Sequence, residues 1–175
     1  MSTTASNPPV NPLARHFERF GGTALGRWAF SQAVVTRAPF FGSISPRIER
    51  LEPGYARLSM KNRRSVHNHI GTVHAIAMCN MAELVMGTCV EASLDPALRW
   101  IPVGMEVEYL KRATTDLVAE CRLENWQAWE VGDVTVPVSI TNTHGDVVCA
   151  ARIRLRLSPK PPKGAHKSSS SKGAA

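Results

Sequence analysis

The stretch from Thr72 to about Leu94 constrains the fold most, because it is long, apolar and free of proline. It is rich in Ala, Met, Leu and Val, which favours a helix, and a helix that is apolar around most of its circumference has to be buried. Thr72 is a residue type that caps helices, so we expect the helix to begin there. His74, Asn80 and Glu83 lie within the stretch, and each is costly in lipid. The sequence therefore predicts a core helix and no transmembrane span.

Segments that alternate apolar and polar residues lie on both sides of this helix. Such alternation is typical of strands with one buried face. Pro53-Gly54 and Thr143-His144-Gly145 are turn sequences, and each joins two neighbouring segments into a hairpin. A sheet of about six strands with one long helix against it is an α+β architecture. The expected strands are Ile44 to Glu52, Tyr55 to Lys61, Gly104 to Leu110, Leu117 to Glu124, Asp133 to Asn142 and Asp146 to Leu157.

The two ends of the chain differ in composition from its centre. Residues 1–12 and 159–175 are rich in Pro, small polar residues or Lys, and such segments bury too little apolar area to offset the entropy of ordering. We expect both to be disordered. The tail holds four lysines, so subtracting them from the net charge of +7 leaves +3, and the charge does not indicate nucleic-acid binding. Residues 13–158 are predicted to form one domain that opens with a broken helical region over 13–38.

The cysteines, together with the two ends, indicate a compartment. All four cysteines lie inside apolar segments without a CxxC pair, which favours buried, reduced thiols. Neither end has the apolar core and flanks of a signal peptide, so we expect a cytoplasmic protein that does not act at a membrane. His67, His69, His74 and Cys79 lack the spacing of a metal site, and we expect neither a metal nor a cofactor.

A short motif gives the chain a family resemblance. Asn68, Gly71, His74 and Glu83 resemble, in type and spacing, a motif of hotdog-fold thioesterases of the phenylacetate-degradation and 4-hydroxybenzoyl-CoA type. In that family the His is followed by a Gly, whereas Ala75 stands here. The segment 109–120 also resembles the family's strand after the helix, where a basic residue often meets coenzyme A. The resemblance covers roughly 44–157. It implies an antiparallel sheet wrapped around a long central helix, here with an extra N-terminal helical region.

The resemblance implies a role for each motif residue. Glu83 is the expected catalytic carboxylate, acting as a base or a nucleophile. The start of the helix at His74 and Ala75 offers free N–H groups and the positive end of the helix dipole, which suits an oxyanion hole. The His74 ring either takes part directly or only caps the helix. Asn68 would position water or the carbonyl group. The expected substrate-binding residues are Gly71 and four cations that suit phosphates, namely Arg63, Arg64, Lys111 and Arg112.

The distance between two of these residues predicts how they combine. Ala75 and Glu83 are eight residues apart, which is about 12 Å along one helix, too far for both to touch one carbonyl group. If two such helices lie antiparallel across a two-fold axis, two identical composite sites result, so we expect a homodimer or a dimer of dimers.

Three functions fit these expectations. The first is hydrolysis of an acyl-coenzyme A thioester to a free acid and coenzyme A at a site in the dimer interface. The second is a noncatalytic acyl-CoA-binding hotdog domain, because the change to Ala75 could leave binding intact and impair chemistry. The third, a hotdog dehydratase or hydratase, lacks a clear Asp-x4-His pattern. The sequence predicts neither the length nor the aromaticity of the acyl group.

Overall fold

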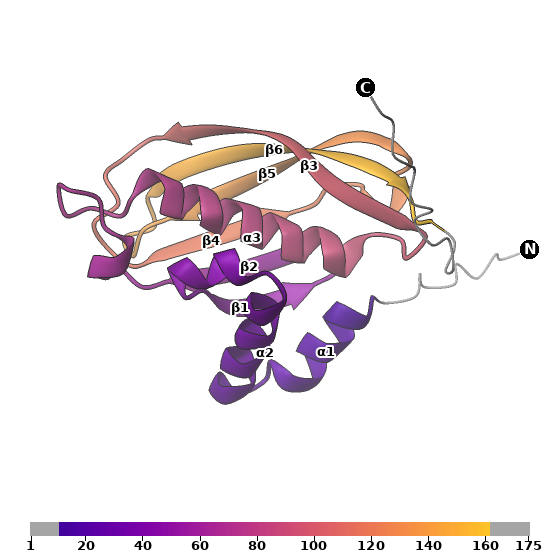
Figure 1. Cartoon of the computed structure of the whole chain (residues 1–175), viewed down its shortest axis with the longest axis horizontal. Coiled ribbons are helices and arrows are strands. Elements are labelled where there is room, and N and C mark those ends of the chain that lie inside the picture. Colours follow the sequence, from indigo (N-terminus) through magenta and orange to yellow (C-terminus); the bar gives the residue numbers. More distant parts are fainter. Residues whose placement is uncertain (1–10, 162–175) are drawn as a thin grey trace, which may run out of the picture.

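Six antiparallel strands form one sheet, in the order β1-β2-β4-β5-β6-β3, so that β1 and β3 are its edges (Figure 1). This computed structural model describes residues 11–161. The expected mixed architecture, with a six-stranded antiparallel sheet and a long helix, is confirmed. The strands are β1 Arg47–Glu52, β2 Tyr55–Met60, β3 Leu98–Tyr109, β4 Leu117–Arg122, β5 Gly132–Thr141 and β6 Val147–Pro159.

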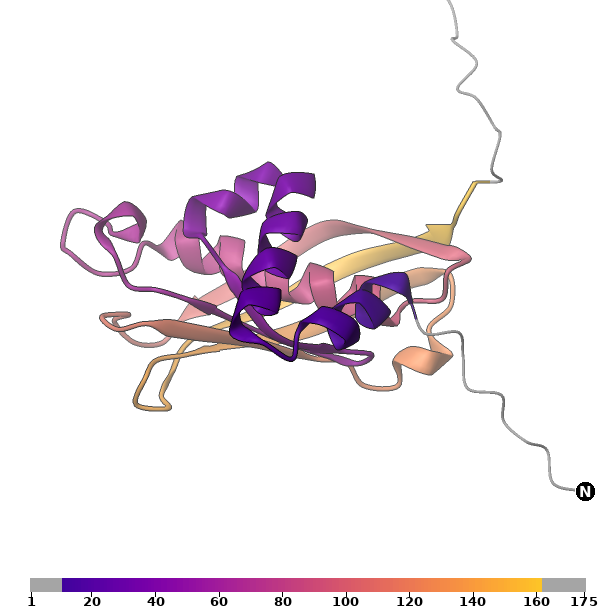
Figure 2. The same ribbon diagram turned by 90° about the horizontal axis from the view of Figure 1, so that it is seen from below.

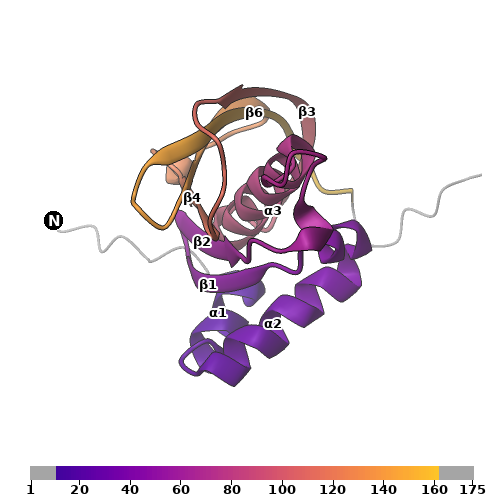
Figure 3. The same ribbon diagram turned by 90° about the vertical axis from the view of Figure 1, so that its left-hand side faces the viewer.

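The long helix, α3 (Ala75–Ser93), lies along the concave side of the curled sheet, as Figure 3 shows in end view. Its side chains Met81, Val85 and Met86 are fully buried. Burying a side chain of this size stabilises the fold by about 1.5–3 kcal/mol. The helix is long and apolar enough to cross a membrane, but 61% of its most apolar window is buried inside the protein. α3 is therefore a core helix that packs against the sheet.

The first turn of α3 lies later than the sequence predicts. The helix begins at Ala75, and its N-cap is His74, whose Nδ1 accepts a hydrogen bond from the Ile76 amide at 3.0 Å. The prediction that Thr72 caps the helix is wrong. Its hydroxyl instead accepts a hydrogen bond from the side-chain amide of Asn68 at 2.8 Å. Because Thr72 is engaged by the preceding loop, the next polar side chain satisfies the first free amide of the helix.

Two helices precede the sheet, α1 (Pro12–Phe20) and α2 (Ala24–Arg37), followed by the 3-10 helix η1 (Pro39–Ile44). They separate at Gly21-Gly22, as the sequence predicts. Gly21 closes α1 where a Cβ would lie 2.7 Å from the Phe17 carbonyl oxygen, and Thr23 caps α2. Phe17 also packs edge-to-face on Phe30, with ring centroids 5.0 Å apart. Figure 2 shows the resulting helical pair on the β1 side of the molecule, beside α3.

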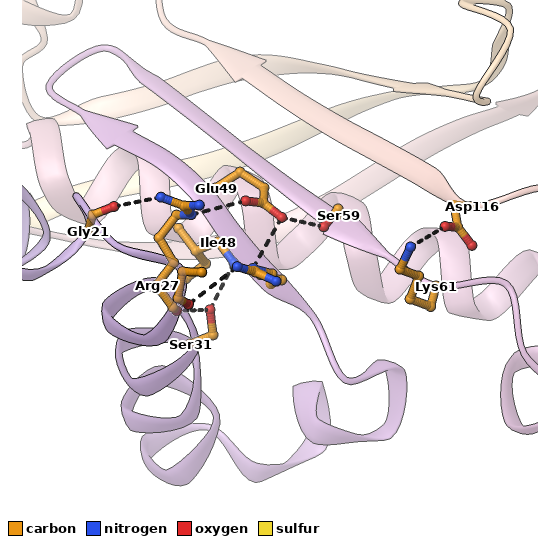
Figure 4. Close-up of polar contacts among 10 residues, drawn as sticks. Gly21, Arg27, Ser31, Ile48, Glu49, Ser59, Lys61 and Asp116 are labelled. Carbon is orange, nitrogen blue, oxygen red and sulfur yellow. Dashed lines mark hydrogen bonds and ion pairs between the residues drawn. The ribbon is translucent and has the colours of Figure 1, made fainter.

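A polar network holds α2 on β1 (Figure 4). Glu49 pairs with Arg27 at 3.3 Å and with Arg47 at 3.5 Å, and it accepts a hydrogen bond from Ser59 at 2.8 Å. Ser31 donates to the Arg27 carbonyl and accepts from the Ile48 amide at 2.8 Å. The α2 helix is therefore fixed on the sheet by directional bonds as well as by apolar packing.

Two strands begin three or more residues away from the predicted start. β1 starts at Arg47 rather than Ile44, because the 3-10 helix runs to Ile44 and Ser45 takes a left-handed conformation. β3 starts at Leu98 rather than Gly104. Pro102 lies inside this strand, and an edge strand tolerates proline because one of its sides has no partner strand. The ladder to β6 absorbs it with an irregularity between Pro102 and Gly104.

The ordered part of the chain extends beyond 13–158. Asn11 accepts a hydrogen bond from the Leu13 amide and caps α1, which begins at Pro12. At the other end the Lys160 amide donates to the Ala97 carbonyl at 2.8 Å. The prediction of disorder is therefore wrong for 11–12 and for 159–160. Its remaining parts, residues 1–10 and 162–175, lie outside the described residues, while Pro161 follows β6 without regular structure.

The four cysteines are free thiols, as expected. Cys89, Cys121 and Cys149 are buried as predicted, but the prediction of burial is wrong for Cys79, which is half-buried. A hydrogen bond from Cys89, together with burial, raises the pKa of Cys121. Burial also raises the pKa of Cys149 to about 11. Cys121 and Cys149 therefore stay protonated and behave as small core residues.

Candidate active site

The first turn of α3 presents one free backbone donor. The Ile76 amide is taken by the His74 ring, and the Ala77 amide donates to the His74 carbonyl. Within residues 11–161 no acceptor is bonded to the Ala75 amide. The expected N–H donor at this helix start is thus available for a ligand, next to the positive end of the helix dipole. The His74 side chain acts as the cap.

The loop before α3 is built around Asn68. Its Oδ1 accepts from the amides of Ile70 and Thr72, both at 3.1 Å, and its Nδ2 donates to Thr72 Oγ1. Gly71 has φ +78°, a left-handed conformation that glycine adopts without strain. Asn68 therefore shapes the loop that leads into the helix, and only one Nδ2 hydrogen is left for a ligand.

Basic residues gather at the same end of α3. The Val73 amide donates to the Ala113 carbonyl at 2.9 Å, which places the segment after β3 beside the helix start. Arg63, Arg64 and Arg112 are exposed, and no ion pair engages them within the described range 11–161. Lys111 is different, because Asp146 holds its ammonium group at 2.6 Å. Three of the four expected phosphate-binding cations are therefore free to meet a ligand.

Glu83 lies two turns further along α3, on the wall of a cavity of about 1380 Å³. The residue is half-buried, and its carboxylate has neither a hydrogen bond nor an ion pair in the part of the chain that the structure describes. Most of the wall is apolar, with Phe30, Val34 and Phe41 facing α3. A carboxylate without a donor partner in the protein is free to accept a hydrogen bond from a bound water or ligand.

The N-terminal helices form the far wall of this cavity. Residues of both α1 and α2 line it opposite Glu83, Gly87 and Glu91 of α3. The sequence predicts these helices but not the cavity between them and α3. Periodicity shows which face of a helix is apolar, but it does not show which element packs against that face. The start of β3 closes one side with Trp100, whose indole N–H donates to Glu91 at 3.0 Å.

One residue of the site was not singled out from the sequence. Asn80 is buried, donates to Ser43 Oγ at 3.1 Å, and leaves its Oδ1 without a partner among the described residues. It lines a second cavity of about 200 Å³ that also touches His67 and His74. A polar side chain in the middle of an apolar helix was the available signal. The unpaired oxygen is an acceptor for a ligand or water beside the helix start.

Another contact that sequence reasoning missed joins α3 to β3. The Tyr109 hydroxyl lies 3.1 Å from Cys79 Sγ, and this hydrogen bond, with burial and the nearby thiols, raises the pKa of Tyr109 to about 12. No local pattern links two residues that are 30 positions apart. Tyr109 stays protonated across the physiological range.

The edge strand β3 exposes side chains that face the helix layer. Met105 is opposite Ile153 and Tyr109 is opposite Cys149 in β6, and residues opposite each other in a ladder share a face. Ile153 and Cys149 are buried, whereas Met105 is 37% and Tyr109 49% exposed. Ile76 in the first turn of α3 is 59% exposed. Residues 11–161 thus leave an apolar strip uncovered along β3 and the start of α3.

Within one copy of the chain, the Ala75 amide and the Glu83 carboxylate lie far apart. Ala75 and Glu83 are separated by eight residues of continuous α3, about 12 Å, as the sequence predicts. The Ala75 amide, Asn68 and the free arginines lie at one end of the helix, and Glu83 lies on the cavity further along. Within residues 11–161, no cluster of three or more His, Cys, Asp or Glu side chains is arranged to hold a metal ion.

Comparison with known proteins identifies relatives of this fold. The structural-genomics protein APC5556 has a crystal structure that is 39% identical in sequence, with a TM-score of 0.75 over 85% of this chain and 99% of that one. A protein of unknown function from Pseudomonas aeruginosa, described as a probable thioesterase, is 26% identical, with a TM-score of 0.67 over 87% and 98% of the two chains.

More distant structures share the fold alone. A thioesterase from Haemophilus influenzae is 12% identical, with a TM-score of 0.63 over 73% of this chain and 87% of that one. The architecture is thus that of the thioesterase hotdog folds, which confirms the expected fold. Among curated proteins no significant match is found. The sequence profile described as Domain of unknown function (DUF4442) matches residues 26–157, which is more than half of the chain. The chain therefore belongs to the DUF4442 family.

Proposed function

We propose that this protein hydrolyses acyl-coenzyme A thioesters, with Glu83 as the catalytic carboxylate. The observation that carries the proposal is the unpaired, half-buried carboxylate of Glu83 on the wall of a large apolar cavity. The similarity to the Pseudomonas aeruginosa protein described as a probable thioesterase supports the same reaction class. The cavity suits the acyl group, and the carboxylate suits the reacting carbon at its boundary.

The proposed reaction needs one base and one oxyanion donor. Glu83 takes a proton from water, and the resulting hydroxide attacks the thioester carbon. The carbonyl oxygen gains negative charge, which a free backbone N–H stabilises best at the positive end of a helix. The C–S bond then breaks, and the proton held by Glu83 passes to the departing sulfur. The products are a carboxylic acid and coenzyme A.

The oxyanion donor in this proposal is the Ala75 amide of a second subunit. It is the amide in the first turn of α3 that no acceptor engages within residues 11–161, and it lies too far from Glu83 of its own chain. Two α3 helices arranged antiparallel would bring the start of each to the middle of the other. The apolar strip along β3 and Ile76 supports such a dimer, because association would cover side chains that one copy leaves exposed.

The nucleotide part of coenzyme A would bind at the helix start. Arg63, Arg64 and Arg112 are exposed near Ala75, and guanidinium groups bind phosphate oxygens through paired hydrogen bonds. Asn68 and Gly71 keep the loop in the shape that presents these groups. Lys111 contributes less in this proposal because Asp146 already neutralises it.

Release of coenzyme A from a panel of aliphatic and aromatic acyl-CoAs tests this proposal. Glu83→Gln keeps the shape of the side chain but removes the base, and we expect turnover to fall at least about 100-fold with binding retained. Glu124→Gln is the matched control, since it makes the same change at an exposed residue that does not line the cavity. Its turnover should stay within about threefold of wild type. Unchanged turnover in Glu83→Gln would refute the role of Glu83, and binding without turnover in wild type would favour a noncatalytic acyl-CoA-binding domain.

A further inference from the structure

The cavity beside Glu83 is elongated along α3. Glu83, Gly87 and Glu91 all line it, and residues four positions apart lie on one face of a helix. From Glu83 to Glu91 the cavity thus follows α3 for eight residues, which is about 12 Å. Glu91 is exposed and bonded to the Trp100 indole, so its carboxylate lies at the solvated outer end. We call this elongated, partly open cavity the channel; it leads away from the proposed reacting carbon.

At its middle the channel is bounded by the α3 backbone at Gly87 and by the Trp100 ring. A Cβ at Gly87 would lie 3.1 Å from the Trp100 ring, so the indole rests directly on the helix backbone there. The hydrogen bond to Glu91 fixes the indole in this place. Trp100 therefore forms a flat apolar side wall without a projecting side chain from Gly87.

The roof of the channel comes from α1 and α2. Its lining includes the large apolar side chains Leu13, Phe20, Phe30 and Val34, together with the small side chains Ala29 and Ala33. The network of Arg27 and Glu49 fixes α2 on β1, so the roof is held by bonds outside the channel. An apolar channel with a fixed roof is preformed for an apolar ligand.

We infer that this channel binds a linear acyl chain of about ten or more carbons, with its carbonyl carbon at Glu83 and its methyl end toward Glu91. This inference rests on the proposed function and adds the substrate class. An extended chain advances about 1.2 Å per bond, so about ten bonds span the 12 Å of α3 that line the channel. The cavity of about 1380 Å³ has room for such a chain.

Chain length then sets the specificity. Each buried methylene group contributes about 0.8 kcal/mol, which is about a fourfold gain in affinity. We expect kcat/KM for saturated acyl-CoAs to rise by up to about fourfold per added carbon from butyryl-CoA to about dodecanoyl-CoA, and then to level off. Benzoyl-CoA and phenylacetyl-CoA fill only the part of the channel next to Glu83, so they should be poorer substrates than dodecanoyl-CoA.

A narrowed channel tests the assignment. Ala33→Trp places a large ring in the roof, and Gln32→Trp makes the same addition on an exposed position of α2 that does not line the channel. We expect Ala33→Trp to lower the ratio of dodecanoyl-CoA to butyryl-CoA turnover at least about tenfold, and Gln32→Trp to leave it unchanged. Thermal melts of both variants check that the fold is kept. A flat chain-length profile, or an equal ratio in both variants, would overturn the inference.

Calorimetric binding of dodecanoate, below its micellar concentration, separates this inference from the proposed function. If no acyl-CoA is hydrolysed, but dodecanoate binds and Ala33→Trp weakens it at least about tenfold, the channel assignment holds and the hydrolase proposal fails. If short or aromatic acyl-CoAs are hydrolysed and dodecanoate does not bind, the hydrolase proposal holds and the channel assignment fails.

Discussion

Replacing Ala75 by proline removes one hydrogen atom from the site and keeps the helix. Proline suits the first position of a helix, where the N–H has no intrahelical partner. His74 has φ −65° and ψ 139°, an extended conformation that is compatible with a following proline. The Ala75 amide bonds to no acceptor within residues 11–161, so no native hydrogen bond is lost. We expect the free energy of unfolding to stay constant or to rise by up to about 1 kcal/mol.

Turnover of the Ala75→Pro variant should fall, although its stability is kept. Loss of one oxyanion donor lowers kcat about 100- to 1,000-fold, equivalent to about 2.7–4 kcal/mol of transition-state stabilisation. Coenzyme A release gives kcat and KM, and thermal melts give stability. Ala75→Gly retains the N–H and should stay within about threefold of wild type. Ala24→Pro is the matched control, because it places proline at the first position of α2. A stable Ala75→Pro variant with wild-type kcat would refute the assignment of the Ala75 amide.

Three further changes test the structures that support the site. Gly71→Ala should cost about 1–2 kcal/mol of stability because φ is +78°, whereas Gly22→Ala should cost nothing; equal melting temperatures would contradict this. Glu49→Gln should cost about 1–2 kcal/mol in denaturant unfolding, because Arg27 loses its carboxylate partner and keeps only its bond to the Gly21 carbonyl. The exposed Glu52→Gln should cost at most about 0.5 kcal/mol, as expected for a surface pair, and similar losses in both variants would be inconsistent with the network. Lys61 and the Asn62 amide hold the pKa of Asp116 below its usual range, so its stabilisation is present at neutral pH and is lost as pH falls below about 4. Asp116→Asn should cost about 0.5–1 kcal/mol at pH 7 and lose less stability on acidification than wild type, and parallel acid profiles would argue against it.

The elements that the sequence predicts well are those with a strong local pattern. The apolar stretch around Glu83 can only be buried, and alternating residues beside Pro53-Gly54 define a hairpin without reference to the rest of the chain. The distance between Ala75 and Glu83 follows from helix geometry alone. These three features were therefore predictable from the sequence alone.

The missed features depend on contacts between distant segments. Thr72 is a good cap by type, but Asn68 engages its hydroxyl, so His74 takes the role. Pro102 conceals the first half of β3, because the sequence does not say which strand is an edge. The cavity beside Glu83 exists because α2 docks on β1, and periodicity predicts neither the partner nor the gap. Tertiary placement decides each of these.

A mixed dimer tests the composite site most directly. Subunits with Ala75→Pro and subunits with Glu83→Gln are co-expressed with different affinity tags, and the doubly tagged dimer is purified and assayed for coenzyme A release. If each site takes its amide from one subunit and its carboxylate from the other, one of the two sites is fully wild type. The mixed dimer should then have about half of the wild-type turnover, although both parent dimers are nearly inactive. A mixed dimer as inactive as its parents would contradict a site shared between subunits.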